Sequence, residues 1–145
     1  SLQLDVLSAK TRELLRVASV LGVQLRLSSL AGTLGVDPKQ LLAELEEALS
    51  RRVLCKTADG AYRFSHVLVR DVLYRSLGVA RRAELHEAAG RAAQRDEDHE
   101  TAVVHYERAL QLLDLLARVS GRISAGDEQT RAESLRAALD ERRHA

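Results

Sequence analysis

The chain changes its hydrophobic period between residues 53 and 64, and this change restricts the possible folds more than any other feature. On both sides, apolar residues recur every three or four positions, which is typical of amphipathic helices. Between them, Val53–Thr57 and Ala61–Phe64 flank the turn Ala58-Asp59-Gly60, which predicts two strands joined by an Asp-Gly turn. A two-stranded hairpin is marginally stable alone, so we expect it to pack on neighbouring helices.

Three helices are predicted before the hairpin, over Ala9–Leu21, from Ser28 or Ser29 to Leu34, and over Pro38–Arg51. Ser8 and Asp37 are placed to cap the first and third helices, while Gly22 and Gly35 end the first and second. The inward side of the third helix is expected to consist of Leu41, Leu42, Leu45, Ala48 and Leu49. Three helices followed by a hairpin is the order of a winged helix.

Four further helices are predicted after the hairpin, over Ser65–Leu77, Ala80–Arg95, Asp98–Ser120 and Asp127–Arg143. Ser65 and Asp127 are the expected caps, Gly78 ends the first of the four, and the stretch Gly121–Gly126 precedes the last. The acidic run Asp96-Glu97-Asp98 is interpreted as a loop and a helix N-terminus, where carboxylates complement the helix dipole. The expected inward residues are Val69, Val72, Leu73 and Leu77 in the first helix and Leu135, Ala138 and Leu139 in the last.

The second half also contains small and aromatic residues at the spacing of a tetratricopeptide repeat, namely Gly90, Ala102, Tyr106 and Ala109. Small residues allow two antiparallel helices to approach closely, and the tyrosine ring fills the groove beside them. His86 and Asp114 stand where this repeat usually has tryptophan and proline. We therefore predict a mainly α fold: a winged helix with a two-stranded wing over residues 1–78, then tetratricopeptide-like antiparallel helices over 79–145.

Composition argues against several classes of function. The chain is 46% apolar and 30% charged, with a net charge of +1, so it carries no overall attraction for nucleic acid or anionic membranes. Cys55 is the single cysteine, and no apolar run approaches the ~20 residues that span a bilayer. We expect a cytoplasmic protein without a membrane partner. The start at Ser1, without methionine, leads us to expect a segment of a larger protein.

No catalytic constellation is found in the sequence. The eight glycines form neither a phosphate-binding loop nor a dinucleotide fingerprint. No two of the five histidines are three or four residues apart, so no single helix is expected to offer two imidazoles to a metal. Cys55 has no neighbouring histidine to activate it. We therefore expect neither an enzyme nor a metal or cofactor site in this segment.

Two kinds of binding remain open besides contacts within a larger protein. If the wing contacts DNA, its phosphate ligands would be Arg51, Arg52, Lys56 and Arg63. However, residues 37–52 contain four acids against three cations, a balance that disfavours phosphate contact by the third helix. A protein-interaction scaffold is the other alternative, in which the repeat pair and the charged last helix bind a partner or a second copy.

Five motifs resemble the segment that follows the nucleotide-binding core in bacterial STAND-type ATPases, the large LuxR-type regulators. The motifs are Leu4–Ser8, Glu13–Gly22, Arg63–Tyr74, Arg81–His86 and His105–Leu110. The resemblance extends to about Leu116 and is most specific over Phe64–Tyr74. It implies a winged helix that acts as a regulatory hinge in signal transduction or transcription regulation, between an ATPase domain and a repeat-built sensor.

The resemblance also assigns expected roles to single residues. ATP or ADP would bind in an upstream domain, and a histidine near the end of the winged helix would approach the phosphates of bound ADP. His66 is the candidate because it comes just after the wing. Arg70, one turn further along, is expected to pair with Asp71 or with a carboxylate of a neighbouring domain. The expected partners are the ATPase and repeat domains of the same protein, and we favour these protein contacts over DNA.

Overall fold

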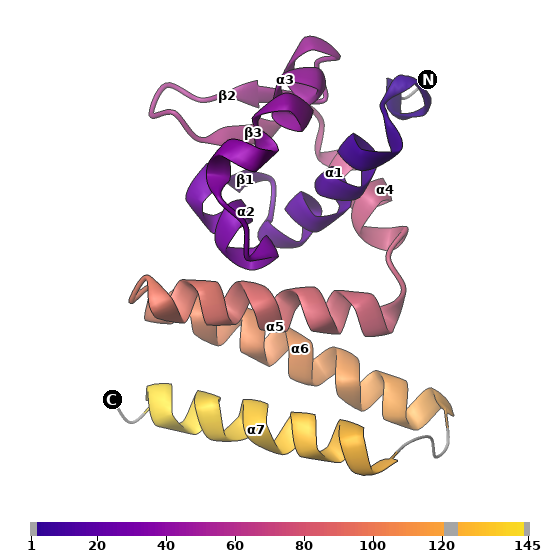
Figure 1. The fold of residues 1–145 in the computed structure, drawn as a ribbon. Coiled ribbons are helices and arrows are strands. Elements are labelled where there is room, and N and C mark those ends of the chain that lie inside the picture. Colours follow the sequence, from indigo (N-terminus) through magenta and orange to yellow (C-terminus); the bar gives the residue numbers. More distant parts are fainter. Residues whose placement is uncertain (1–2, 121–124, 144–145) are drawn as a thin grey trace. The chain divides into compact units, whose positions relative to one another are not determined.

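A computed structural model describes residues 3–120 and 125–143 of the chain, and they form a mainly helical protein with one small antiparallel sheet. The chain divides into two compact units, Ser1–Leu77 (unit 1) and Gly78–Ala145 (unit 2). Unit 1 contains the sheet with its surrounding helices, and unit 2 contains three successive long helices (Figure 1). The boundary lies one residue from the one expected between residues 78 and 79.

The first two helices of unit 1 form close to their expected positions. After the short turn η1 (Gln3–Val6), helix α1 runs over Ala9–Leu21, with the Ser8 side chain accepting a hydrogen bond from the Thr11 N–H. Helix α2 (Leu27–Leu34) begins slightly earlier than expected and has no side-chain cap. It ends at Gly35, whose φ of 69° lies in the left-handed region that glycine adopts without strain. The predicted ends of both helices are confirmed.

The third predicted helix consists of two pieces, the 3₁₀ turn η2 (Pro38–Leu41) and the helix α3 (Leu42–Ser50). Asp37 caps the turn by accepting from the Lys39 N–H, as expected. Leu42 was expected to face inward, but it is 46% exposed. A 3₁₀ turn has three residues per turn, whereas an α-helix has 3.6. Where the turn joins α3, the residues that face inward are therefore not those that one continuous α-helix would place there.

The predicted hairpin is present as strands β2 (Leu54–Lys56) and β3 (Tyr62–Phe64), with Gly60 at a φ of 86° in the turn. Leu54 pairs with Phe64, and both side chains are buried. The sheet nevertheless has three strands in the order β1-β3-β2, because β1 (Gln24–Leu25) pairs with the other edge of β3. The expectation of a two-stranded wing was therefore wrong, since a two-residue strand is too short to show an alternating pattern.

Helix α4 (Val67–Arg75) follows the sheet, but its N-cap residue is His66 and not the expected Ser65. The Ser65 N–H donates to the Val53 carbonyl, so Ser65 still belongs to the pairing of the hairpin. Val72, expected to face inward, is 47% exposed. The buried residues of α4, Val69 and Leu73, form one narrow stripe, and Leu77 is buried just beyond the helix. Gly78, expected to end α4, is instead the N-cap residue of the next helix.

Unit 2 is built from α5 (Val79–Arg95), α6 (His99–Ser120) and α7 (Ala125–Arg143), and its two packed pairs are α5 with α6 and α6 with α7. Gly90 lies against the ring of Tyr106, and Ala102 and Ala109 are fully buried. The small and aromatic residues therefore line the contact between α5 and α6, as the repeat spacing predicts. The predicted break at 121–126 lies largely outside the described residues, and α7 already includes Ala125 and Gly126.

The acidic run between α5 and α6 forms a loop and a cap, as expected. Asp98 accepts a hydrogen bond from the Thr101 N–H at 3.2 Å. Hydrogen bonds to Thr101 lower the pKa of Asp98, because they favour the ionised carboxylate. In α7, Leu135 and Leu139 are buried and Ala138 is partly buried, which confirms the predicted inward side of the last helix.

Arg52 after α3 and Glu97 after α5 have a left-handed φ of 60°, which is uncommon for residues other than glycine. At Arg52 the chain closes a Schellman-type helix end, in which the Val53 N–H bonds to the Ala48 carbonyl. We expect Arg52→Gly to stabilise unit 1 by roughly 0.5–1 kcal/mol, because glycine adopts this conformation without a Cβ clash. Urea denaturation followed by circular dichroism measures the change. Ser50→Gly, at the last residue of α3, is the control and should destabilise, because it removes the hydrogen bond from the Ser50 hydroxyl to the Glu47 carbonyl. The same shift in both variants would contradict the argument.

Candidate functional site

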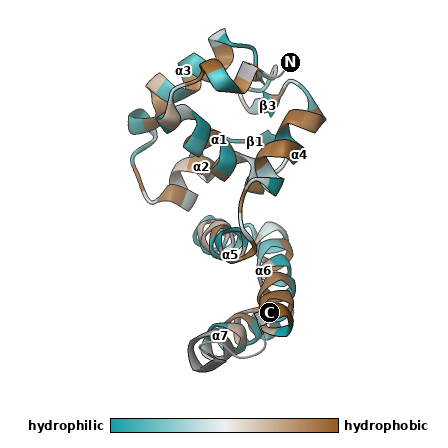
Figure 2. Cartoon of the chain, turned by 90° about the vertical axis from the view of Figure 1, so that its right-hand side faces the viewer, coloured by the Kyte–Doolittle hydropathy of each residue, from teal (hydrophilic) through white to brown (hydrophobic). Residues whose placement is uncertain are grey.

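Helix α4 exposes three apolar side chains, which we call the α4 face: Val67, Leu68 and Val72, with exposed fractions of 54%, 75% and 47%. The opposite side of the helix is buried through Val69 and Leu73, and α4 packs against α1. Figure 2 shows the hydrophobic residues of α4 in brown. Three exposed apolar side chains on one short helix are typical of a surface that docks on another, and the exposed Arg75, one turn beyond Val72, lies beside them.

Arg70 holds this helix on α1. Its Nε donates a hydrogen bond to the Ser19 carbonyl at 2.7 Å, and its guanidinium lies 4.7 Å from the centre of the Tyr74 ring. A terminal nitrogen pairs with Asp71 at 3.4 Å, which is one of the two partners expected from the sequence. The contacts with Tyr74 and Asp71 lie within α4 and orient the guanidinium, and the bond to the Ser19 carbonyl links α4 to α1. Arg70 therefore supports the α4 face from within unit 1.

His66 lies directly before α4 and is exposed. Its imidazole does not cap the helix, whereas its backbone carbonyl accepts from the Val69 N–H at 3.1 Å. The side chain therefore has no structural task at the helix start. Contact with a phosphate of another domain stays a prediction for this residue.

The four cations predicted as phosphate ligands, Arg51, Arg52, Lys56 and Arg63, are all exposed. Arg63 is in register with Cys55 on one side and Gln24 on the other, and its guanidinium lies 3.8 Å from the Cys55 sulfur. The Lys56 ammonium is 5.4 Å from the centre of the Tyr62 ring. The register places Lys56 on the face of the sheet that carries Tyr62 and Arg63 on the other face with Cys55, so the hairpin does not gather the predicted phosphate ligands on one surface.

The acidic side chains of α3 point in different directions. Glu47 accepts hydrogen bonds from the Ser8 N–H at 2.9 Å and from the Ser8 and Thr11 hydroxyls, and these bonds lower its pKa. Glu44 pairs with Lys10 at 3.3 Å, and its side chain is only 11% exposed. Two of the four acids that disfavoured phosphate contact are therefore directed at α1. A charge count along the sequence carries no information on direction. Glu47 nevertheless keeps its negative charge and interacts electrostatically with Arg51, so the argument against phosphate contact by α3 stays a prediction.

Sequence reasoning missed a buried pair of histidines in unit 2. His86 on α5 and His105 on α6 are 6% and 7% exposed, and their Nδ1 atoms are 2.9 Å apart. One ring must donate its Nδ1–H and the other must accept, so the two rings are different tautomers. Burial lowers the pKa of His105, and the carboxylate of Asp98 partly opposes this.

The search for histidine pairs within one helix could not find residues that meet across two helices. A usable signal was the inward position of His86, three residues from both Ala83 and Ala89. Among the residues that the structure describes, no group of three or more histidines, cysteines and carboxylates is placed to hold a metal ion. At this pair, burial makes a charged His105 imidazole unfavourable.

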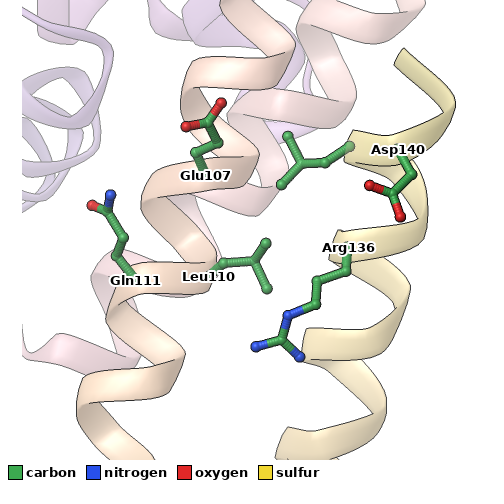
Figure 3. Close-up of a pocket in the computed structure, with 6 residues that line it drawn as sticks. Glu107, Leu110, Gln111, Arg136 and Asp140 are labelled. Carbon is green, nitrogen blue, oxygen red and sulfur yellow. The ribbon is translucent and has the colours of Figure 1, made fainter. Parts of the chain in front are cut away.

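An open depression of about 370 Å³ lies between α6 and α7. Figure 3 shows Glu107, Leu110 and Gln111 on α6 opposite Arg136 and Asp140 on α7. Arg136 is paired with Asp114 at 3.2 Å, so its charge is already partly balanced. The lining combines acidic side chains, one cation and apolar residues at the edge of the core. This mixture is typical of the exposed margin between two packed helices and does not indicate a particular kind of ligand.

Comparison with protein-family models, curated proteins and solved structures finds no match to this chain. Within the part of the chain that the structure describes, no helix is both long and apolar enough to cross a membrane.

Proposed function

We propose that the chain is a regulatory segment of a bacterial STAND-type regulator, built from a winged helix and tetratricopeptide-like helices, that acts through protein–protein contacts and not as an enzyme. The α4 face carries this proposal. Its three apolar side chains lie on a helix that Arg70 fixes to α1, so the surface is rigid before it meets a partner. A preformed apolar surface loses little conformational freedom on binding, which favours association.

The proposed occupant of the α4 face is the nucleotide-binding ATPase domain, and two observations support this choice. His66 lies next to Val67 in the sequence, and its exposed imidazole is available to reach a phosphate bound by that domain. The motif Phe64–Tyr74, which carries the family resemblance most specifically, contains both His66 and the α4 face. A change in the bound nucleotide would then alter the contact with α4 and be passed on to the repeat helices.

Photo-cross-linking tests this contact. We replace Leu68 with the photoreactive amino acid p-benzoylphenylalanine in the complete protein in its native cell. The expected product joins position 68 to a peptide of an ATPase nucleotide-binding domain. Adding Val72→Glu should reduce the yield at least tenfold, because a carboxylate buried in an apolar contact loses its hydration.

The same amino acid at Val104, which is 63% exposed on α6, is the matched control for an accessible apolar position. It should yield no ATPase peptide. Equal yields from positions 68 and 104, no product from position 68, or a product that lacks an ATPase domain would each overturn the proposal.

A further inference from the structure

Unit 2 carries a group of arginines on one side, which we call the arginine surface: Arg91 and Arg95 on α5, with Arg131 and Arg142 on α7. Arg91 and Arg95 are one helical turn apart. Arg131 and Arg142 are about three turns apart, so they also lie on one side of their helix. Glu87 joins the two helices, because its carboxylate pairs with Arg91 on α5 and with Arg131 on α7. The two pairs of arginines therefore lie on the sides of α5 and α7 that face each other.

Tyr106 on α6 places arginines of both helices close together. Burial raises the pKa of its hydroxyl, and the charged groups that act on it are Arg91, Arg142 and Arg95, which lower the pKa, and Glu87, which raises it. Such effects require charges within a few ångströms of the hydroxyl. Three arginines and one glutamate therefore surround the same point of unit 2.

Arg142 differs from the other arginines because its described partner is a neutral ring. Its Nη1 donates to Nδ1 of His99 at 2.8 Å, so this imidazole accepts the bond and is neutral. Its Nε is buried and has no hydrogen-bond acceptor among the residues that the structure describes. Arg91 and Arg131, in contrast, share the carboxylate of Glu87. A guanidinium without a described carboxylate, near two that share one, leaves positive charge that attracts an oxyanion.

The carboxylates near this surface do not cancel its charge. Glu87 is one carboxylate between two arginines, and Asp98 caps α6. Asp140 lies about 180° around α7 from Arg131 and lines the depression shown in Figure 3, on the other side of the helix. The exposed acids at positions 96 and 97 follow α5 in the loop to α6 and bound the surface at that end. The surface is therefore locally positive although the whole chain carries only +1.

The dimensions of the arginine surface indicate the kind of anion. Arg131 and Arg142 are about 16 Å apart along α7 at a rise of about 1.5 Å per residue, so a single small anion can contact only one end. An extended peptide places alternate side chains on one face about 6.6 Å apart, close to the ~6 Å between arginines one helical turn apart. Proteins that bind nucleic-acid single strands stack bases on exposed rings, but Tyr106 is only 3% exposed. An extended peptide with carboxylates therefore fits this surface best.

We propose that the arginine surface binds an extended acidic segment of a protein partner, with glutamate or aspartate side chains at alternate positions. This contact goes beyond the proposed regulatory function, lies within unit 2 and uses no residue of the α4 face. Arg142 makes the main contact, because a carboxylate that binds its guanidinium displaces no described carboxylate of the chain.

Fluorescence anisotropy on the full chain tests the proposal, with a labelled nine-residue peptide in which glutamate and serine alternate. We expect a Kd on the order of 100 μM at 50 mM salt, weakened about fivefold at 500 mM salt because the contacts are exposed ion pairs. The variant R91Q/R142Q should bind about tenfold more weakly, and it leaves Arg131 paired with Glu87. R142K keeps the charge and should lose only about threefold. Circular dichroism verifies that both variants are folded.

The matched control is R108Q/R118Q, which removes the same charge from exposed positions on another side of α6 and should bind like the parent chain. A peptide in which lysine and serine alternate should not bind, and a 20-nucleotide single strand of DNA should bind more weakly than the acidic peptide. An equal loss in the two double variants, binding of the lysine peptide, tighter binding of the DNA strand, or no binding of the acidic peptide at about 1 mM protein in 50 mM salt would overturn the proposal.

Discussion

Replacing Gly90 with valine should destabilise unit 2 by about 3 kcal/mol, the upper range for overpacking a well-filled contact. A Cβ at position 90 would lie 2.6 Å from Cε1 and 2.7 Å from Cδ1 of Tyr106. The ring has no room to move aside, because Tyr106 is 3% exposed and its hydroxyl donates to Gln94 Oε1 at 2.7 Å. Urea denaturation followed by circular dichroism, with hydrogen exchange of the α5 amides, measures the loss.

Two variants separate this clash from the intrinsic helix preference of valine. Ala80→Val, at an exposed position of α5, should destabilise by only about 0.5 kcal/mol, since it changes helix propensity alone. In Tyr106→Ala the ring is absent, so adding Gly90→Val to that variant should do little further harm. If Gly90→Val lowers the free energy of unfolding by no more than Ala80→Val does, the close contact between Gly90 and Tyr106 does not determine the stability of unit 2.

Single substitution of either buried histidine should destabilise unit 2 by about 1–3 kcal/mol, because the remaining ring stays buried and loses the hydrogen bond between the two Nδ1 atoms. His86→Leu together with His105→Leu should cost much less than the sum of the two, since an apolar pair needs no hydrogen bond there. Denaturation at pH 7.5 measures all three variants. Additive losses would show that the two rings do not act together.

The same pair predicts how stability depends on pH. The folded-state pKa of His105 lies below its ordinary value of 6.5, so the folded state prefers the neutral ring. The contribution of the neutral His105 ring to the free energy of unfolding is fully present above pH 6.5. It is lost as the pH falls from 6.5 towards the folded-state pKa, because His105 of the unfolded chain binds a proton at a higher pH than His105 of the folded chain. Asp98 has a lowered pKa and therefore affects stability only in more acidic solution. In the variant with both His86→Leu and His105→Leu, the free energy of unfolding should decrease much less between pH 7 and pH 5 than in the parent chain. An unchanged decrease would show that other groups cause it.

Local sequence signals predicted most of the helix and strand positions. Ser8 and Gly22 bound α1 because a hydroxyl that accepts an N–H and a glycine are favourable at helix ends whatever the surroundings. The hairpin was predicted because its Asp-Gly turn and alternating strands lie within twelve consecutive residues. The repeat spacing likewise predicted the contact of Gly90 with Tyr106, although these residues lie on different helices, because it encodes a recurrent packing of two helices.

Features that depend on direction or on distant partners could not be predicted in this way. The strand β1 has two residues and is defined only by its pairing with β3, and Val72 is exposed because the contact with α1 uses a narrower stripe than its apolar pattern suggested. The candidate residues show the same division. The exposed cations of the hairpin were identified by residue type, whereas the faces on which Lys56 and Arg63 lie, and the direction of Glu44, are visible only in the structure.

The sequence by itself determined where the helices and the hairpin form, because capping, turn chemistry and periodicity act between residues close together in the chain. Only the tertiary structure decided which charges remain exposed beside the hairpin, which apolar side chains α4 leaves uncovered, and that His86 meets His105. Each of these depends on which way a side chain points once two elements pack, and that direction is set by contacts between residues far apart in the sequence.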